Sequence, residues 1–129
     1  MVTRTARTRG FTLIELLIVL AIVGTLLTIA VPSYFASLDN AKETSLRQSL
    51  SVMRTAIDHY KGDLGKYPEN LQELVTAKYL RSIPSDPITG MPDQWVLEMG
   101  GEAGQASGVR DVHSGAPGNA KDGTPYASW

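Results

Sequence analysis

Apolar residues form one long stretch near the N-terminus. Between Phe11 and Val31 the single charged residue is Glu15, and the other polar side chains are three threonines. A helix rises about 1.5 Å per residue, so this stretch would span roughly 30 Å, the thickness of a bilayer's hydrocarbon core. We therefore expect a membrane-spanning helix over residues 11–31 and a separate, more polar domain over residues 32–129.

A different apolar pattern follows Pro32. Apolar residues recur mainly every three or four positions, which predicts the amphipathic half of one long helix over residues 33–62. Pro32 removes one backbone hydrogen bond, so we expect it and Ser33 to interrupt or kink this helix. Gly62 and Gly65 are expected to end it. The apolar stripe consists of Leu38, Leu46, Leu50, Met53, Ile57, Tyr60 and Leu64.

The remainder of the chain reads as short elements joined by loops. Residues 67–75 predict a short amphipathic helix, with Pro68 in its first turn. Residues 94–99 and 109–112 predict two short strands, separated by a glycine-rich loop. The tail from Ser114 to Trp129 is too rich in glycine and proline for extended regular structure.

Charge and cysteine content limit which partners the chain can have and how its small domain can be stabilised. The first ten residues carry three arginines and no acid, and the remainder has four more acidic than basic side chains. This balance argues against nucleic acid as the main partner. The chain has no cysteine, so a domain of under a hundred residues must be stabilised without disulfides.

The N-terminal segment does not fit an ordinary cleaved secretory signal, because its apolar stretch is long and no small-residue cleavage site follows it. As a membrane anchor, its arginine-rich flank would stay cytoplasmic and the C-terminal domain would lie outside, in the periplasm. Neither interpretation explains Glu15. A carboxylate in lipid costs at least a few kcal/mol unless it is paired or reaches the interface.

The segment Arg9-Gly10-Phe11-Thr12-Leu13-Ile14-Glu15 closely resembles the signal of type IV pilins and type II secretion pseudopilins. The resemblance implies a leader over residues 1–10, cut between Gly10 and Phe11 by a prepilin peptidase that also N-methylates Phe11. It further implies that subunits wait in the inner membrane before an assembly platform stacks them into a helical filament.

Glu15 gains a role from this resemblance. The new ammonium of Phe11 needs an anion in an apolar environment, and Glu15 lies one helical turn away, in the same or a neighbouring subunit. The alternative is that Glu15 reaches the membrane surface and has no partner. Gly24 and Pro32 correspond to a stretch that unwinds on assembly in the family, although an ordinary proline kink is also consistent with the sequence.

Two later segments resemble the major, G-type pseudopilin of type II secretion: residues 60–68, YKGDLGKYP, and residues 83–87, IPSDP. The implied fold is α+β and type IV pilin-like, with the long helix packed on a small antiparallel sheet and a loop-rich C-terminus. The implied role is the structural subunit of a periplasmic pseudopilus that helps move folded proteins across the outer membrane. A type IV pilin, a minor pseudopilin that partners the major one, and a membrane-tethered binding module remain alternatives.

In the resembling group a calcium ion ties the C-terminal loop to the sheet. Asp111 and Asp122 are the expected carboxylate ligands, followed by Ser114 and then Thr124. The alternative is that these residues simply favour turns in an exposed loop. His113 is a poor calcium ligand, and we expect it on the surface.

No enzyme is expected. The sequence lacks a phosphate-binding loop, a nucleophile elbow and a cluster of metal-binding histidines or cysteines. The chain is interpreted as a substrate of a peptidase and methyltransferase rather than as a catalyst.

Overall fold

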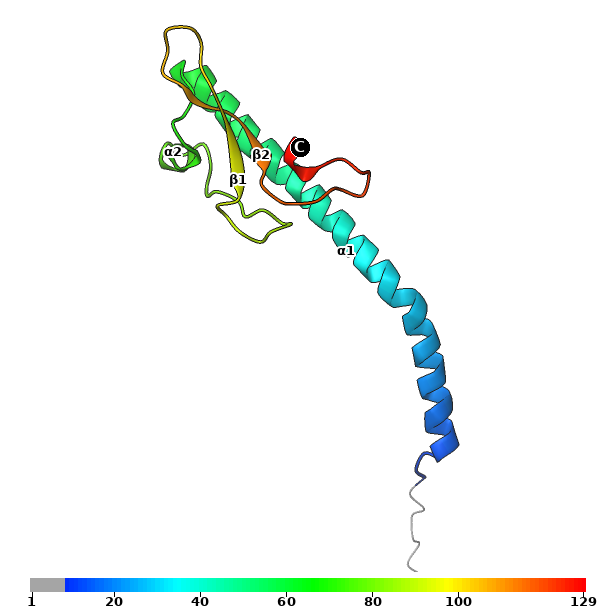
Figure 1. The fold of residues 1–129 in the computed structure, drawn as a ribbon. Coiled ribbons are helices and arrows are strands. Elements are labelled where there is room, and N and C mark those ends of the chain that lie inside the picture. Colours follow the sequence, from blue (N-terminus) through cyan, green and yellow to red (C-terminus); the bar gives the residue numbers. More distant parts are fainter. Residues whose placement is uncertain (1–8) are drawn as a thin grey trace, which may run out of the picture. The chain divides into compact units, whose positions relative to one another are not determined.

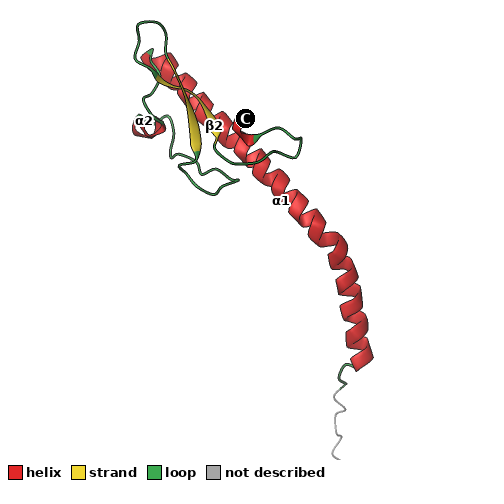
Figure 2. Ribbon diagram, in the orientation of Figure 1, coloured by secondary structure: helices red, strands yellow, loops and turns green. Residues whose placement is uncertain are grey.

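The computed structural model describes residues 9–129, so most of the expected leader lies outside the described residues. The elements are helix α1 (Leu13–Leu64), helix α2 (Leu71–Thr76), strands β1 (Trp95–Gly100) and β2 (Gly108–Ser114), and the 3-10 turn η1 (Tyr126–Ser128) (Figures 1 and 2). They confirm the α+β architecture. The chain divides into two compact units, residues 1–38 and 39–129.

Helix α1 contains both Gly24 and Pro32 without a break. The helix is therefore not interrupted at Pro32 and Ser33, and the expected kink stays a prediction. A proline in a helix removes one hydrogen bond, and α1 continues through Pro32 although its neighbours Val31 and Ser33 are only moderate helix formers. Unwinding at Gly24 and Pro32 during assembly stays a prediction.

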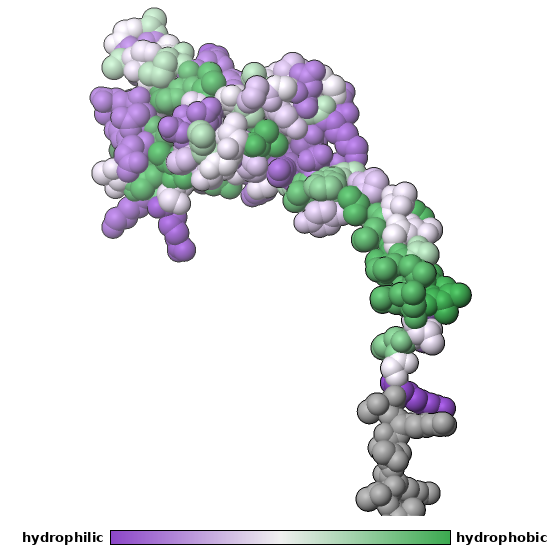
Figure 3. Space-filling model, turned by 60° about the horizontal axis from the view of Figure 1, so that its bottom comes forward, coloured by the Kyte–Doolittle hydropathy of each residue, from purple (hydrophilic) through white to green (hydrophobic). Residues whose placement is uncertain are grey.

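The apolar part of α1 is unburied. Its large side chains, such as Leu13 at 77% and Ile29 at 72% exposure, have no protein around them. Green, hydrophobic atoms cover this stretch in Figure 3. By length and composition α1 is able to cross a membrane, and residues 13–31 of the expected segment over 11–31 are helical.

The second unit is built on the other half of α1. The stripe is buried from Leu46 to Tyr60, whereas Leu38 and Leu64 are exposed, contrary to expectation. Leu38 precedes the globular unit, and Leu64 is the last helical residue. Gly65, at φ 70°, ends the helix, while Gly62 lies inside it. The core residues that share this helix face are Leu46, Leu50, Met53, Ala56, Ile57 and Tyr60.

Strands β1 and β2 form one antiparallel hairpin beside this part of α1 (Figure 1). Trp95 pairs with Ser114 and Glu98 with Asp111, and the register shifts between Glu98 and Met99. Both predicted strands are present: β1 begins and ends one residue later than expected, and β2 is three residues longer. Val109 and Val112 of β2 are fully buried against the core of the second unit.

Helix α2 begins later than predicted. Asn70 caps it by accepting a hydrogen bond from the Glu73 N–H at 2.9 Å, so Pro68 lies before the helix rather than in its first turn. An asparagine side chain offers the free N–H groups of a helix start an acceptor that proline lacks. The tail is irregular apart from η1, as predicted, and Trp129 packs against the core.

Candidate functional site

The expected cleavage site lies in exposed, non-helical chain just before α1. Arg9, Gly10 and Phe11 are exposed, and a Cβ added to Gly10 would meet no atom within 4 Å. The backbone here is therefore open on all sides. Such a segment is accessible to a protease that binds extended chain.

Thr12 and Glu15 form a reciprocal cap at the start of α1. The Thr12 hydroxyl accepts a hydrogen bond from the Glu15 N–H at 3.2 Å, and the Glu15 carboxylate accepts one from the Thr12 N–H at 3.3 Å. This is the capping-box arrangement, which satisfies two otherwise free backbone donors. It explains why the helix begins at Leu13 rather than at Phe11.

The cap gives Glu15 a partner before any filament exists. The carboxylate lies at the helix N-terminus, where the helix dipole also favours a negative charge. Its contact with Thr12 is long and exposed, so little free energy is lost when Glu15 turns to another donor. Thr12 was missed in the sequence, although threonine three residues before glutamate is the signature of this cap.

The four residues expected to bind calcium are each hydrogen-bonded to groups of the protein. Asp111 accepts a hydrogen bond from Arg54 Nε on α1 at 2.7 Å, and Arg54 Nη2 also donates to the Val112 carbonyl at 2.8 Å. Burial raises the pKa of Asp111, but the Val112 N–H and Arg54 outweigh it and hold that pKa below its usual value. Asp111 is therefore already paired.

Ser114 is engaged elsewhere. It is fully buried at the end of β2, and its hydroxyl donates to Asp86 Oδ2 at 2.6 Å. The same hydroxyl accepts from the Ala116 N–H at 3.1 Å. Asp86 is also fully buried and accepts from the Ile88 N–H at 2.8 Å. Ser114 thus joins the hairpin to the loop before β1.

Asp122 and Thr124 do contact each other in the tail. The Thr124 hydroxyl and N–H both donate to Asp122 Oδ1, at 2.5 and 3.0 Å, and these bonds lower the pKa of Asp122. Trp129 Nε1 donates to the same hydroxyl at 2.9 Å. Calcium needs six to eight oxygens around one point. In the described contacts Asp111 and Ser114 each have other partners, whereas Asp122 and Thr124 bond to each other. Calcium binding stays a prediction that this arrangement does not favour.

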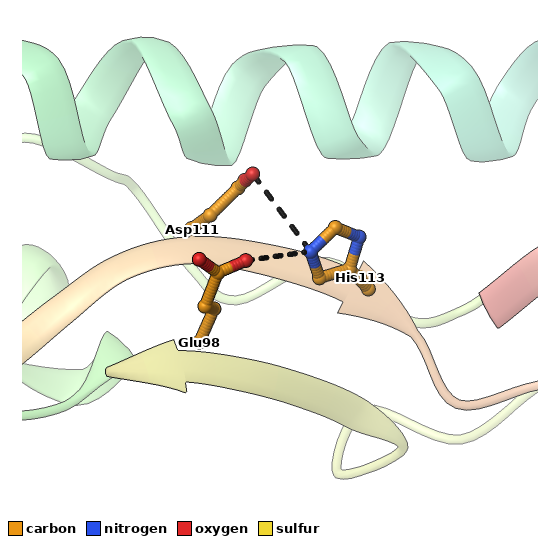
Figure 4. Close-up of side chains that lie close together, drawn as sticks. All are labelled: Glu98, Asp111 and His113. Carbon is orange, nitrogen blue, oxygen red and sulfur yellow. Dashed lines mark hydrogen bonds and ion pairs between the residues drawn. The ribbon is translucent and has the colours of Figure 1, made fainter. Parts of the chain in front are cut away.

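A different cluster lies on the hairpin. Glu98 of β1 and Asp111 and His113 of β2 point toward one another (Figure 4). His113 Nε2 lies 3.3 Å from Glu98 Oε2 and 3.8 Å from Asp111 Oδ2. The bond from His113, followed by the ion pair with Arg110, holds the pKa of Glu98 below its usual value.

His113 is thus not a free surface residue, contrary to expectation. Its side chain is 25% exposed, and Nδ1 lies 2.7 Å from the Trp129 carbonyl oxygen. A carbonyl only accepts, so Nδ1 carries the proton. The sequence offered one sign of this cluster: alternate residues of a strand share a face, as Asp111 and His113 do.

The comparisons with known proteins agree with this structure. Residues 5–31 match the model of the prokaryotic N-terminal methylation motif. The "Type II secretion system core protein G" of Klebsiella michiganensis is 30% identical over 130 residues, covering 88% of this chain and 89% of that protein. The chain belongs to the type II secretion system core protein G family. Its counterpart in Escherichia coli K12 is 29% identical over 116 residues, covering 78% of each chain.

The core protein G family is thus the major pseudopilin family that the middle segments had indicated. Pilins also match part of the chain. The "Type IV major pilin protein PilA" of Myxococcus xanthus is 35% identical over 68 residues, 53% of this chain and 31% of that pilin. No solved structure is significantly similar to this chain. The match over almost the whole chain confirms the family resemblance and the pilin-like α+β fold.

Proposed function

We propose that this chain is a structural subunit that polymerises into the pseudopilus of a type II secretion machine. The observation that carries the proposal is an exposed apolar helix on a chain of the core protein G family. The Gly10–Phe11 peptide bond before this helix is exposed, and Glu15 caps its first turn. Apolar surface left bare on one chain is stable only in lipid or against other subunits.

Processing comes first in this proposal. A prepilin peptidase cuts between Gly10 and Phe11 on the cytoplasmic side, and Phe11 is N-methylated. The chain is the substrate in both steps and catalyses neither. The single-pass orientation follows from the basic flank, including Arg9, which favours the cytoplasm, while the unit over residues 39–129 lies in the periplasm.

Assembly then exchanges the partner of Glu15. The carboxylate leaves Thr12 and meets the Phe11 ammonium of a subunit already in the filament, guided by an inner-membrane platform and primed by minor pseudopilins. A weak local cap replaced by an ion pair in an apolar core gives a free-energy gain that is available only in the filament. Subunits that stack head to tail in this way form an open filament and not a closed ring.

Substitutions at two positions separate the charge of Glu15 from its capping role. Gln at position 15 keeps a side chain able to complete the cap but loses the charge. We expect Glu15→Gln to be cleaved normally, to yield no pseudopili when overproduced, and to abolish exoprotein release. Thr12→Ser, which keeps the cap and the charge, is the matched control and should support both. Normal filaments from Glu15→Gln would contradict the proposed exchange.

The type IV pilin remains the second candidate because two pilins also match this chain, over 53% and 65% of its length. A deletion strain discriminates the two. Loss of exoprotein secretion with intact twitching motility supports the pseudopilus, and the reverse supports a surface pilus.

A further inference from the structure

Three possible metal-ligand atoms, one each from Glu98, Asp111 and His113, lie within 4.8 Å of one another on the hairpin. Nδ1 of His113 donates to the Trp129 carbonyl, so an unprotonated Nε2 has a lone pair for a metal ion, whereas a protonated Nε2 donates to Glu98. Nε2 faces two carboxylate oxygens, Glu98 Oε2 and Asp111 Oδ2. A proton on Nε2 compensates these two carboxylates, and a metal cation that replaces the proton compensates them as well.

The remaining oxygens of both carboxylates are held by arginines. Arg54 binds Asp111 Oδ1 at 2.7 Å, and Arg110 pairs with Glu98 Oε1. Each carboxylate therefore has one oxygen engaged and one directed at His113. This outer layer of contacts orients ligands in the way that protein metal sites do, including the backbone carbonyl on the distal nitrogen of the histidine.

The spacing suits a small tetrahedral ion. With ligands about 2.0–2.1 Å from zinc at tetrahedral angles, neighbouring ligand atoms lie roughly 3.4 Å apart. The observed separations from Nε2 are 3.3 Å to Glu98 and 3.8 Å to Asp111, and all three ligand atoms lie within 4.8 Å of one another. One nitrogen with two oxygens is a zinc-type set, whereas calcium takes oxygens alone.

We propose that Glu98, Asp111 and His113 form a binding site for a divalent transition metal ion, with zinc the best fit. The site opens onto a surface pocket of ≈ 730 Å³ that Asp111, His113 and Trp129 help to line. Water reaches the ion through this pocket and supplies the fourth ligand.

Bound zinc links three parts of a chain that has no cysteine. It joins β1 to β2 through Glu98 and Asp111, and it strengthens the His113 Nδ1–H bond that holds the Trp129 carbonyl. The metal thus fastens the hairpin and the tail, as a disulfide does in other small exported domains. This site does not depend on the proposed filament function.

The test uses the full-length chain in detergent, stripped of metal and titrated with ZnCl₂ by calorimetry. We expect one zinc per chain and a rise in the unfolding midpoint that a chelator reverses. His113→Gln and Glu98→Gln should each weaken binding at least about tenfold, because each removes a ligand. His59→Gln is the matched control, since His59 is the chain's other histidine and is exposed on α1, and it should bind zinc normally.

Cobalt gives an independent signature, since four-coordinate Co²⁺ absorbs visible light far more strongly than hydrated Co²⁺. We expect this absorption in wild-type protein and its loss in His113→Gln. Absence of saturable zinc binding would overturn the proposal. So would unchanged binding in His113→Gln and Glu98→Gln, or tighter binding of calcium than of zinc.

Discussion

Arg54 of α1 and Asp111 of β2 form the ion pair that joins the long helix to the hairpin. Arg54 Nε lies 2.7 Å from Asp111 Oδ1, and Nη2 donates to the next carbonyl, that of Val112. The two side chains are 37% and 34% exposed. One guanidinium thus binds a side chain and a backbone oxygen of the same strand, and fixes the position of β2 along α1.

Replacing Arg54 should loosen the hairpin. We expect Arg54→Ala to lower the free energy of unfolding by about 1–2 kcal/mol, the value of charged hydrogen bonds reduced for partial exposure. Arg54→Lys should recover only part of this loss, because an ammonium lacks the planar fork that reaches both oxygens. Denaturant unfolding in detergent measures the change.

The control is Arg81→Ala, which removes an exposed arginine outside this pair. It should change stability by less than about 0.5 kcal/mol. An effect of Arg54→Ala as small as that of the control would show that the ion pair does not hold the hairpin.

Ser114 should be important for stability rather than for calcium. Ser114→Ala leaves Asp86 Oδ2 and the Ala116 N–H without their buried partner. Each lost hydrogen bond leaves a buried polar group without a partner, so we expect a loss of about 2–3 kcal/mol in the free energy of unfolding. Ser107→Ala, in the exposed loop between the strands, is the control.

A double-mutant cycle sharpens this prediction. If Ser114 acts through Asp86, then adding Ser114→Ala to Asp86→Ala costs much less than Ser114→Ala alone. Additive losses would mean that the two residues contribute independently, and would contradict a stabilising contact between them.

The sequence predicted best what rests on local periodicity. The apolar run from Phe11 and the stripe from Leu46 to Tyr60 are repeated patterns, and the structure contains both as helix. The start of α1 was also encoded locally, in Thr12 and Glu15, because a capping box spans only four residues. Helix boundaries away from such pairs were less accurate, as Asn70 rather than Pro68 shows.

Contacts between distant residues carry no such local signal. Asp111 and Ser114 were chosen as metal ligands because their residue types suit calcium, yet each has its own partner. Arg54 lies 57 residues from Asp111, and Asp86 lies 28 residues from Ser114. The cluster around His113 also requires a strand register that no short motif specifies.

Glu43 holds the tail to α1 and should control its mobility. Its carboxylate accepts the Lys121 N–H at 2.8 Å and the Tyr126 hydroxyl at 3.2 Å. Glu43→Ala removes both bonds, and a loss of about 1 kcal/mol makes local opening about fivefold more frequent. We expect trypsin to cleave after Lys121 about fivefold faster, as followed by mass spectrometry.

Arg47 should keep part of the tail in place in this variant, because its guanidinium lies 4.0 Å from the centre of the Trp129 ring. Combining Glu43→Ala with Arg47→Ala should therefore accelerate cleavage further. Glu102→Ala, in a different exposed loop, is the control and should leave the rate unchanged. Equal rates for Glu43→Ala and Glu102→Ala would contradict the role of Glu43.

Tyr60 and Glu73 should make stability depend on pH at both extremes. The buried Tyr60 hydroxyl donates to Glu73 Oε1 at 2.5 Å. This bond, together with the Glu69 N–H at 2.6 Å, lowers the pKa of Glu73, and it raises the pKa of Tyr60 to about 12. The same contact therefore lowers the pKa of the Glu73 carboxyl and raises the pKa of the Tyr60 hydroxyl.

The two pKa shifts determine how stability changes with pH. The pKa of Glu73 is depressed on folding, so its contribution is present above the unfolded value of about 4.3 and is lost as pH falls through the folded one. The pKa of Tyr60 is raised, so its contribution is complete below about pH 10 and is lost as pH rises toward about 12. Unfolding midpoints should be highest between these limits.

Tyr60→Phe separates this pair from other titrating groups. It should cost about 1 kcal/mol at neutral pH and flatten both the acidic and the alkaline decline, because one hydroxyl causes both shifts. Tyr67→Phe, whose ring lies 4.7 Å from Lys61 Nζ, leaves the pair intact and should keep the wild-type profile. Circular dichroism melts from pH 3 to 12 would measure this, and an unchanged profile in Tyr60→Phe would assign the dependence to other residues.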